Sequence, residues 1–322
     1  MSAGDRPSAL EGRASDLTPL TVDRLTPGEV PAGSAELWFT ERMFAQAGYA
    51  LRIKRTLHAE QTRFQRIDLF ESFHHGRVLA LDGCVMLTEL DEFIYHELLT
   101  HTAAQTLEAP RRAVVVGGGD GGAVRELLKY PELEVTLAEI DERVVRISQE
   151  FLPATSACLT DPRVTLAFED GAEFLARSES GSLDLVVVDG TDPVGAAGAL
   201  VTDSFYGRAA GALADHGVFV QQTQSPFYHP GEIRRIYAGL SRAFPHVWMF
   251  WGVCPSYLGA FWTFCYASRA RHPLDHLGSA SLAPEALGAE YYSHGVHRGA
   301  FALPPFARRC LPEGHPQRAA DA

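Results

Sequence analysis

The sequence is poor in cysteine and in positive charge. Its 322 residues include five cysteines, an odd number, and no two of them have the C-x-x-C spacing of a metal or redox motif. We therefore expect a reducing, cytoplasmic setting. The 28 Lys and Arg residues are outnumbered by 40 Asp and Glu residues, which leaves a net charge of -12. This balance disfavours nucleic acid as a partner and suits a small cationic substrate.

The N-terminal region lacks the apolar core of a signal peptide, because Asp5, Arg6 and Glu11 interrupt it. Residues 247–267, in contrast, contain no charged residue and are long enough to cross a bilayer. Pro255 lies in the middle of this stretch and would break a helix, and the aromatic residues on both sides favour strands. We therefore predict two buried strands joined by a turn rather than a membrane span, and no membrane partner.

Spacings typical of metal sites are also missing. None of the thirteen histidines belongs to a helical i, i+4 pair with an intervening glutamate. His96 and His101 are five residues apart, so they do not share a helix face well. We expect no metal ion.

Composition and pattern divide the chain into three parts. Residues 1–34 are rich in Pro, Gly, Ser and Thr without apolar periodicity, which predicts a flexible tail. Residues 35–90 contain short strand-like runs, such as 64–70 and 77–81, separated by His75-Gly76 and Asp82-Gly83. These dipeptides are hairpin signals and predict a small antiparallel β domain.

The third part, residues 91–322, opens with a stretch of helical spacing over 91–107 and then alternates strand-like and helix-like segments. Strands are expected at 113–116, 134–138, 164–168, 183–188 and 217–221. This alternation is typical of βαβ units around a parallel sheet.

A glycine-rich loop follows the first of these strands. Gly117, Gly119 and Gly122 fit the pattern G-x-G-x-x-G, which is also compatible with a tight turn that binds nothing. Asp120 lies inside the loop and argues against a pyrophosphate, because two like charges ~4 Å apart repel by about 4 kcal/mol at an effective dielectric constant of ~20. A ligand with a sulfonium or ammonium group fits this loop better.

Acidic residues follow four of the five predicted strands. The carboxyl ends of parallel strands lie at one edge of a sheet, so these side chains should converge on one crevice. Each of them alone could equally be a helix cap or a solvated loop residue. The four residues are Asp120, Glu139, Asp170 and Asp189.

The chain resembles the polyamine aminopropyltransferases, the spermidine synthase family. The resemblance is carried by DEFIYHE at 91–97, GGGDGG at 117–122 and DGTDPVG at 189–195, and by shorter matches at 38–41, 81–83, 125–126, 139–141, 170–171, 255–257, 291–292, 296–298, 300–301 and 303–304. It implies an α/β class I methyltransferase-like Rossmann fold, with a mostly parallel seven-stranded sheet flanked by helices behind a small N-terminal antiparallel β domain. It also implies that decarboxylated S-adenosylmethionine is the co-substrate, with no permanently bound cofactor.

The resemblance implies a role for each matching residue. In the family, Glu139 would bind the ribose, Asp170 the adenine amino group and Asp120 the aminopropyl ammonium group. Asp189, with Tyr95, would accept the proton of the attacking amine. The expected co-substrate site contains Gln65, Gly117, Gly119, Asp120, Glu139, Asp170 and Gly171, and the expected amine site contains His96, Asp192, Gln222, Tyr257 and Met86.

Simpler roles are open for several of these residues. Tyr95 could be a core aromatic, Asp192 a turn residue before a proline, and Gln222 a polar group at a strand end. His96 could contact the substrate or only hydrogen-bond a residue that does.

Two features depart from the family pattern. Met86 stands where the family usually has a glutamine, and a thioether is a poor hydrogen-bond partner for an amine. Gly190 and Ala196 replace a serine and a proline in the segment 189–200, a candidate lid, and should loosen it.

The expected function is transfer of an aminopropyl group to a diamine, putrescine above all, giving spermidine and methylthioadenosine. The alternatives are an S-adenosylmethionine-dependent N-methyltransferase and a non-catalytic polyamine-binding paralogue. We expect a homodimer or homotetramer.

Overall fold

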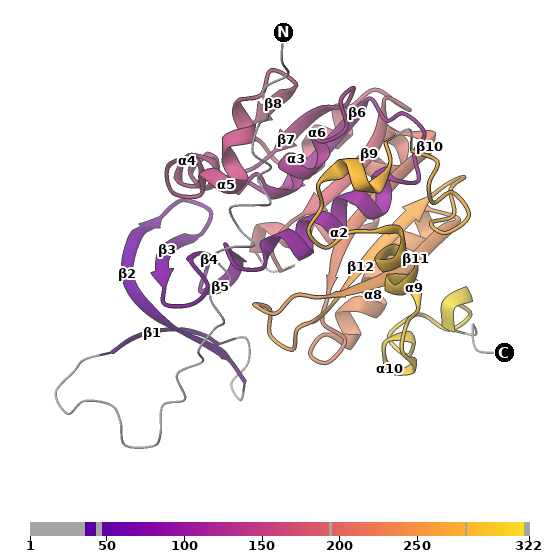
Figure 1. Ribbon diagram of the computed structural model, residues 1–322. Coiled ribbons are helices and arrows are strands. Elements are labelled where there is room, and N and C mark those ends of the chain that lie inside the picture. The colour runs from indigo at the N-terminus through magenta and orange to yellow at the C-terminus, as the bar shows by residue number, and fades with distance from the viewer. Residues whose placement is uncertain (1–35, 43–46, 193–194, 281, 319–322) are drawn as a thin grey trace, which may run out of the picture. The chain divides into compact units, whose positions relative to one another are not determined.

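The computed structural model describes residues 36–42, 47–192, 195–280 and 282–318. The predicted tail, 1–34, lies outside the described residues. The described residues from Leu37 onward form one compact unit that contains two β-sheets (Figure 1). The boundary at residue 90 between a β-sheet domain and a Rossmann-like domain therefore stays a prediction.

The N-terminal sheet is antiparallel throughout and follows chain order. Both predicted hairpin signals lie at its turns. Asp82 and Gly83 have φ values of 50° and 81° and form the two-residue connection between paired Leu81 and Cys84. Two positive φ angles in a two-residue loop are typical of a type I′ turn, which fits the twist of the flanking strands. The strands are β1 (Leu37–Glu41), β2 (Tyr49–Gln61), β3 (Arg66–Ser72), β4 (Arg77–Leu81) and β5 (Cys84–Thr88).

The second sheet has seven strands in the order β11-β12-β10-β9-β6-β7-β8. Neighbours from β10 to β8 are parallel, and β12 runs antiparallel to both β10 and β11. The predicted class I methyltransferase-like Rossmann fold is confirmed. The strands are β6 (Arg112–Gly117), β7 (Glu134–Ala138), β8 (Val164–Ala167), β9 (Leu183–Asp189), β10 (Leu213–Gln224), β11 (His246–Val253) and β12 (Phe261–Ser268).

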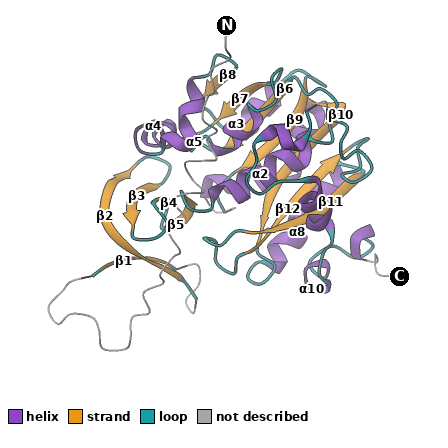
Figure 2. Ribbon diagram, viewed as in Figure 1, coloured by secondary structure: helices purple, strands orange, loops and turns teal. Residues whose placement is uncertain are grey.

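Helices cover both faces of this sheet, as Figure 2 shows. Alternate residues of each strand point to opposite faces, so Val115 and Val187 belong to one hydrophobic core while Val114 and Val186 belong to the other. Both faces are therefore buried, which explains the continuous apolar runs. The helices are α2 (Glu92–Ala104), α3 (Gly122–Leu127), α4 (Glu142–Phe151), α5 (Pro153–Ser156), α6 (Gly171–Arg177), α7 (Asp203–Ala212), α8 (Pro230–Ala243), α9 (His294–Phe301) and α10 (Pro305–Arg308).

The uncharged stretch 247–267 forms most of β11 and β12, with Pro255 in the connection between them. The prediction of two strands is confirmed. No helix among the described residues is both long and apolar enough to cross a bilayer.

Helix α2 is buried far more evenly than its spacing predicts. Leu98 and Leu99 are fully buried, and so are the polar residues Thr100 and His101. Glu97 is buried because its carboxylate accepts the backbone N–H groups of residues 290, 291 and 292 at 2.7 to 2.8 Å. The C-terminal segment thus covers the side of α2 that an isolated sheet–helix pair would expose.

An apolar contact and a buried carboxylate are among the interactions that hold the N-terminal sheet against the rest of the fold. Leu69 and Leu87 pack on Val144 and Ile147 of α4. Asp91, at the start of α2, accepts hydrogen bonds from Thr88 Oγ1 at 2.6 Å and from Ser256 N and Oγ at 2.7 Å. This buried carboxylate joins the end of β5 to the loop between β11 and β12, and both of these segments border the site described next.

Candidate active site

The glycine-rich loop brings β6 against the end of β9. Gly117 and Gly118 have positive φ values of 77° and 73°. A Cβ atom on Gly117 would lie 2.5 Å from the backbone oxygen of Asp189, and one on Gly118 would lie 2.8 Å from Asp189 Oδ2. Only glycine permits this close approach. The loop thus lies close to Asp189, and carboxylate oxygens of Asp120 and Asp189 lie within 4.8 Å of each other.

His96 lies between these two carboxylates. Its Nε2 is 3.4 Å from Asp120 Oδ1 and 3.9 Å from Asp189 Oδ2, and its Nδ1 is 2.7 Å from Glu92 Oε2. The histidine side chain is only 4% exposed. Gly122 gives it room, since a Cβ there would lie 2.2 Å from His96 Cε1.

The charges of this cluster shift the pKa values of its members. Burial alone would lower the pKa of His96, but Asp120 and Glu92 raise it to about 9, so the ring is an imidazolium at neutral pH. Burial and the neighbouring Asp120 raise the pKa of Asp189 to about 6, and His96 opposes this rise. Asp189 is thus poised to exchange a proton near neutral pH.

Asp189 Oδ2 is buried, and no hydrogen-bond partner for it exists among the described residues. Tyr95 lies beside the Asp189 carboxylate, and burial together with this charge holds the phenol pKa well above its usual range. The Tyr95 hydroxyl is therefore neutral and can only donate or accept a hydrogen bond. Its ring packs edge-on against His96 and Tyr257, so the core role and the site role coincide.

A cavity opens beside Tyr95, between the N-terminal sheet and the ends of β9 and β10. Four of the five predicted amine-site residues line it: Met86, Asp192, Gln222 and Tyr257. The fifth, His96, does not line the cavity but packs against Tyr95, which does. The other lining residues are Glu41, Cys84, Val85, Gly190, Thr191, Leu258 and Trp262.

Glu41 is a lining residue that sequence reasoning missed as a site residue. It is 3% exposed, and its Oε2 accepts the backbone N–H of Val85 at 2.9 Å. Burial raises the pKa of this carboxyl. The available signal was the match at 38–41, because Glu41 ends that segment.

Gln224 is a second omission. Its Nε2 donates to Asp192 Oδ1 at 2.6 Å, whereas Gln222, the predicted residue, donates to the backbone oxygen of Gly190 at 3.3 Å. Gln224 adopts a positive φ of 82°, and the register of β10 against β12 shifts between Gln222 and Gln224. This irregularity turns both glutamines toward the segment after β9, and a simple alternation pattern would not predict it.

Glu139 occupies the next position along the sheet edge. Its Oε1 accepts the backbone N–H of Asp141 at 2.9 Å, and a Cβ on Gly119 would lie 3.2 Å from its Oε2. Burial raises its pKa to about 7. Gln65 is held nearby, because its Nε2 donates to Asp141 Oδ2 at 3.2 Å.

Asp170 caps α6, with its Oδ1 accepting the backbone N–H of Ala172 at 2.7 Å. Asp170 is therefore a helix cap, which is one of the simpler roles open to a carboxylate at the end of a strand. Its other oxygen remains available for a ligand. Gly171 begins the helix, and a Cβ there would lie 2.3 Å from Val116 Cγ1. In the candidate lid, residues 193 and 194 lie outside the described part, as does the side chain of Ala196.

Known proteins are similar to this chain in sequence and in architecture. A spermine/spermidine synthase domain model matches residues 92–275, and a spermidine synthase tetramerisation domain model matches residues 37–89. Polyamine aminopropyltransferase of Clostridium acetobutylicum is 41% identical over 275 residues, which are 84% of this chain and 96% of that protein. Its counterpart from Shouchella clausii is 40% identical over 282 residues, 86% of this chain and 99% of that protein.

The chain belongs to the spermidine synthase family. Its structure superposes on a spermidine synthase in complex with the transition-state analogue AdoDATO with a TM-score of 0.82 at 33% identity, over 90% of this chain and 99% of that one. The spermidine synthase of Thermotoga maritima gives a TM-score of 0.80 at 33% identity, over 90% and 98%. The predicted membership of this family of aminopropyltransferases is confirmed.

Ligand atoms of His96, Asp120 and Asp189 all lie within 4.8 Å of one another, a spacing that a metal ion could also use. The raised pKa of His96 makes its ring a cation without any metal ion, and the expectation of no metal ion stays a prediction. In this family member the imidazolium itself supplies the positive charge that the two carboxylates need.

Substitution of Gly122 tests whether the position of His96 matters. Gly122→Ala should push the ring off its place and reduce transferase activity by about 10²-fold, since small displacements of site groups carry costs of that order. Gly207→Ala in α7 is the matched control, because a Cβ there meets nothing within 4 Å. Activity and melting temperature of both variants check this, and a fully active Gly122→Ala protein would contradict the assigned importance of His96.

Proposed function

We propose that this protein transfers the aminopropyl group of decarboxylated S-adenosylmethionine to a diamine, most specifically putrescine, with release of methylthioadenosine. The observation that carries the proposal is the placement of Asp120 beside Asp189 in a buried site. Two carboxylates at this position attract a ligand with sulfonium and ammonium charges. Intact S-adenosylmethionine carries a carboxylate that would be repelled there.

The nucleoside lies along the edge formed by β7 and β8 in this proposal. Glu139 accepts hydrogen bonds from both ribose hydroxyls, and Gln65 approaches from the N-terminal sheet. Asp170 accepts from the adenine amino group, close to Gly171. Gly117 and Gly119 allow the backbone of the loop to approach the ligand closely. Burial of Glu139 favours this use, because hydrogen bonds from the ribose hydroxyls would compensate a carboxylate that has lost water.

The amine enters the cavity lined by Met86 and Tyr257. Asp192 and Glu41 bind its distal ammonium group, while Met86 and Trp262 pack against its methylene chain. Gln222 borders the same channel. The pairing of two carboxylates with apolar walls matches a molecule that has charged ends and an apolar middle.

The reaction is an in-line displacement at carbon. Asp189, with the Tyr95 hydroxyl beside it, takes one proton from the attacking ammonium group and orients the freed lone pair. The nitrogen forms a bond to the methylene carbon next to the sulfonium, the carbon–sulfur bond breaks, and its electron pair stays on the sulfur of methylthioadenosine. Asp189 Oδ2, buried without a hydrogen-bond partner among the described residues, suits this role.

Assembly and location are part of the same proposal. The model matched by residues 37–89 is named for tetramerisation, and exposed Leu37, Trp38 and Phe73 in this region provide apolar contact area. We propose a homotetramer, with a homodimer as its smaller alternative. All five cysteines are free thiols, which fits a reducing cytoplasm.

Co-product identity tests the proposed reaction. Purified protein incubated with putrescine and decarboxylated S-adenosylmethionine should yield methylthioadenosine and spermidine in equal amounts, measured by mass spectrometry. Parallel incubation with intact S-adenosylmethionine serves as the comparison. Formation of adenosylhomocysteine there would identify a methyltransferase instead, and binding without turnover in either mixture would identify a non-catalytic protein.

Met86 tests the amine part of the proposal. Met86→Gln should improve kcat/KM for putrescine relative to cadaverine about fivefold, because one added hydrogen bond contributes ~1 kcal/mol. Leu57→Gln is the matched control: Leu57 packs on the same apolar cluster but does not line the cavity. Steady-state kinetics with both diamines checks the ratio. An unchanged ratio in Met86→Gln, together with a lowered melting temperature, would remove Met86 from the amine site.

A further inference from the structure

Glu92 is a buried carboxylate that the proposed reaction does not use. It lies in the first turn of α2, and its side chain is 9% exposed. Its Oε2 contacts His96 Nδ1 at 2.7 Å, and its Oε1 contacts Arg125 Nη1 at 2.7 Å. A charged group in this position costs desolvation energy unless its partners compensate it. The cost of burying this carboxylate indicates that Glu92 has a function in the site.

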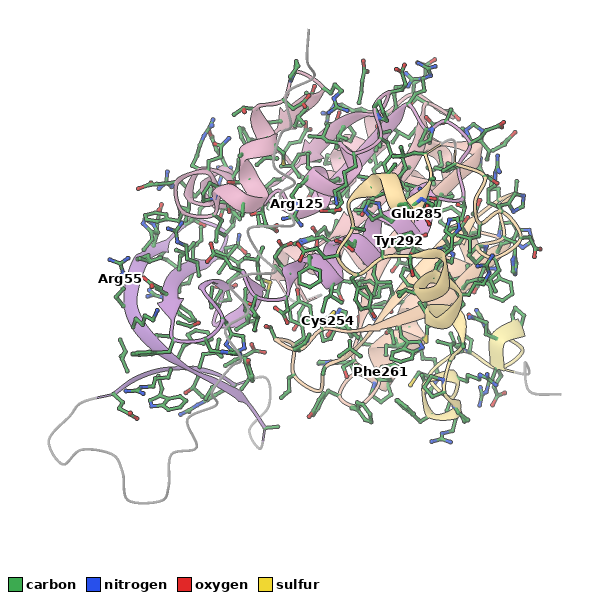
Figure 3. All side chains as sticks on the ribbon, viewed as in Figure 1. Arg55, Arg125, Cys254, Phe261, Glu285 and Tyr292 are labelled. Carbon is green, nitrogen blue, oxygen red and sulfur yellow. The ribbon has the colours of Figure 1, made fainter. Side chains whose placement is uncertain are left out.

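Arg125 holds Glu92 in one orientation. Arg125, labelled in Figure 3, lies on α3, which packs beside α2. Its Nη1 and Nη2 donate to the two oxygens of Glu92 at 2.7 and 2.9 Å, and its Nε donates to Glu126 Oε1 at 2.8 Å. A planar guanidinium bound by both of its edges cannot rotate freely. The Glu92 carboxylate is therefore fixed in position as well as in charge.

The orientation of His96 follows from this clamp. With Nδ1 bound to Glu92, the opposite nitrogen, Nε2, faces the space between Asp120 and Asp189. The backbone at Gly122 and the ring of Tyr95 confine the imidazole on its other sides. The ring can then leave this position only by breaking its bond to Glu92.

We propose that Glu92, held by Arg125, is a positioning residue that fixes a charged His96 between the two carboxylates of the site. The charged groups that face His96 come from three elements: Glu92 on α2, Asp120 in the loop after β6 and Asp189 at the end of β9. All three are acidic. Tyr95 is neutral, and Arg125 acts on the ring only through Glu92.

This arrangement matters because two adjacent buried carboxylates tend to share one proton. The imidazolium favours the ionised form of Asp189, so that Asp189 can accept a proton while Asp120 binds an ammonium group. Without the negative charge of Glu92, the pKa of His96 falls and the ring becomes neutral at a lower pH. The pKa of Asp189 then rises, and a larger share of the enzyme has its base already protonated at neutral pH.

The inference about Glu92 rests on the proposed function. Two independent measurements distinguish a failure of the inference from a failure of the proposed function. Titration of His96 by NMR, with histidine labelled at Cε1 and the signal assigned by its loss in His96→Gln, requires no substrate. The pH dependence of kcat/KM requires the reaction. If wild-type protein transfers no aminopropyl group, the proposed function fails, and the titration still decides the role of Glu92.

Glu92→Gln keeps the size of the side chain and an oxygen acceptor but removes the charge. We expect the His96 titration midpoint to fall by about two pH units or more, from about 9 to about 7 or below, so that much of the ring population is neutral at pH 7. We expect kcat/KM at pH 7 to fall about tenfold, with the ratio of variant to wild type rising as the pH increases. Glu92→Asp, which keeps the charge, should recover most of the midpoint. Glu132→Gln, in an exposed pair with Arg111, is the matched control and should change neither value.

Three results would overturn the proposal. The first is a wild-type His96 that is already neutral at pH 7, which needs no variant to observe. The second is a His96 midpoint that Glu92→Gln leaves unchanged. The third is a loss of activity in Glu92→Gln that is the same at every pH, as expected for a purely structural defect. If Glu92→Gln does not fold, Glu92→Asp and the wild-type titration decide the question.

Discussion

The site depends on the compensation of buried negative charge. Asp120, Asp189 and Glu92 lie within 4 Å of one imidazole ring, in a region where the ring is almost completely buried. Carboxylates in such surroundings are stable only with cations at short range. His96 and Arg125 supply part of that charge from the protein, and an arriving cationic ligand supplies more. The proposed preference for a positively charged co-substrate thus follows from the electrostatics of the site before it follows from its shape.

The rest of the fold serves this cluster. Parallel strands place Asp120, Glu139 and Asp189 at one edge of the sheet, and glycines at 117 and 118 let the loop approach β9. The N-terminal sheet then closes the other side of the cavity with Glu41 and Met86. Asp91 ties this sheet to the loop that carries Tyr257, whose hydroxyl donates to the backbone oxygen of Met86 at 2.7 Å. The two walls of the proposed amine cavity are therefore held together by hydrogen bonds.

Much of this architecture could be predicted from the sequence, because it depends on local patterns. Apolar runs, a two-residue turn at Asp82-Gly83 and a glycine loop after a strand each carry their own signal. Contacts between distant segments carry none. Glu92 and Arg125 are 33 residues apart in the sequence. Glu41 lines the cavity only because the N-terminal sheet packs against the rest of the fold, and no local sequence pattern predicts that packing. Asp170 shows a second reason why sequence prediction fails. A strand-end carboxylate that caps a helix has the same sequence pattern as one that binds a ligand, so the pattern does not tell the two roles apart.

The central claim is that this site selects its co-substrate by charge. Titration calorimetry of the purified protein with decarboxylated and with intact S-adenosylmethionine tests it most directly. A repulsion of about 4 kcal/mol at ~4 Å predicts at least about 10²-fold tighter binding of the decarboxylated compound, with the difference shrinking in Asp120→Ala. Equal affinities for the two compounds, or tighter binding of intact S-adenosylmethionine, would contradict the account.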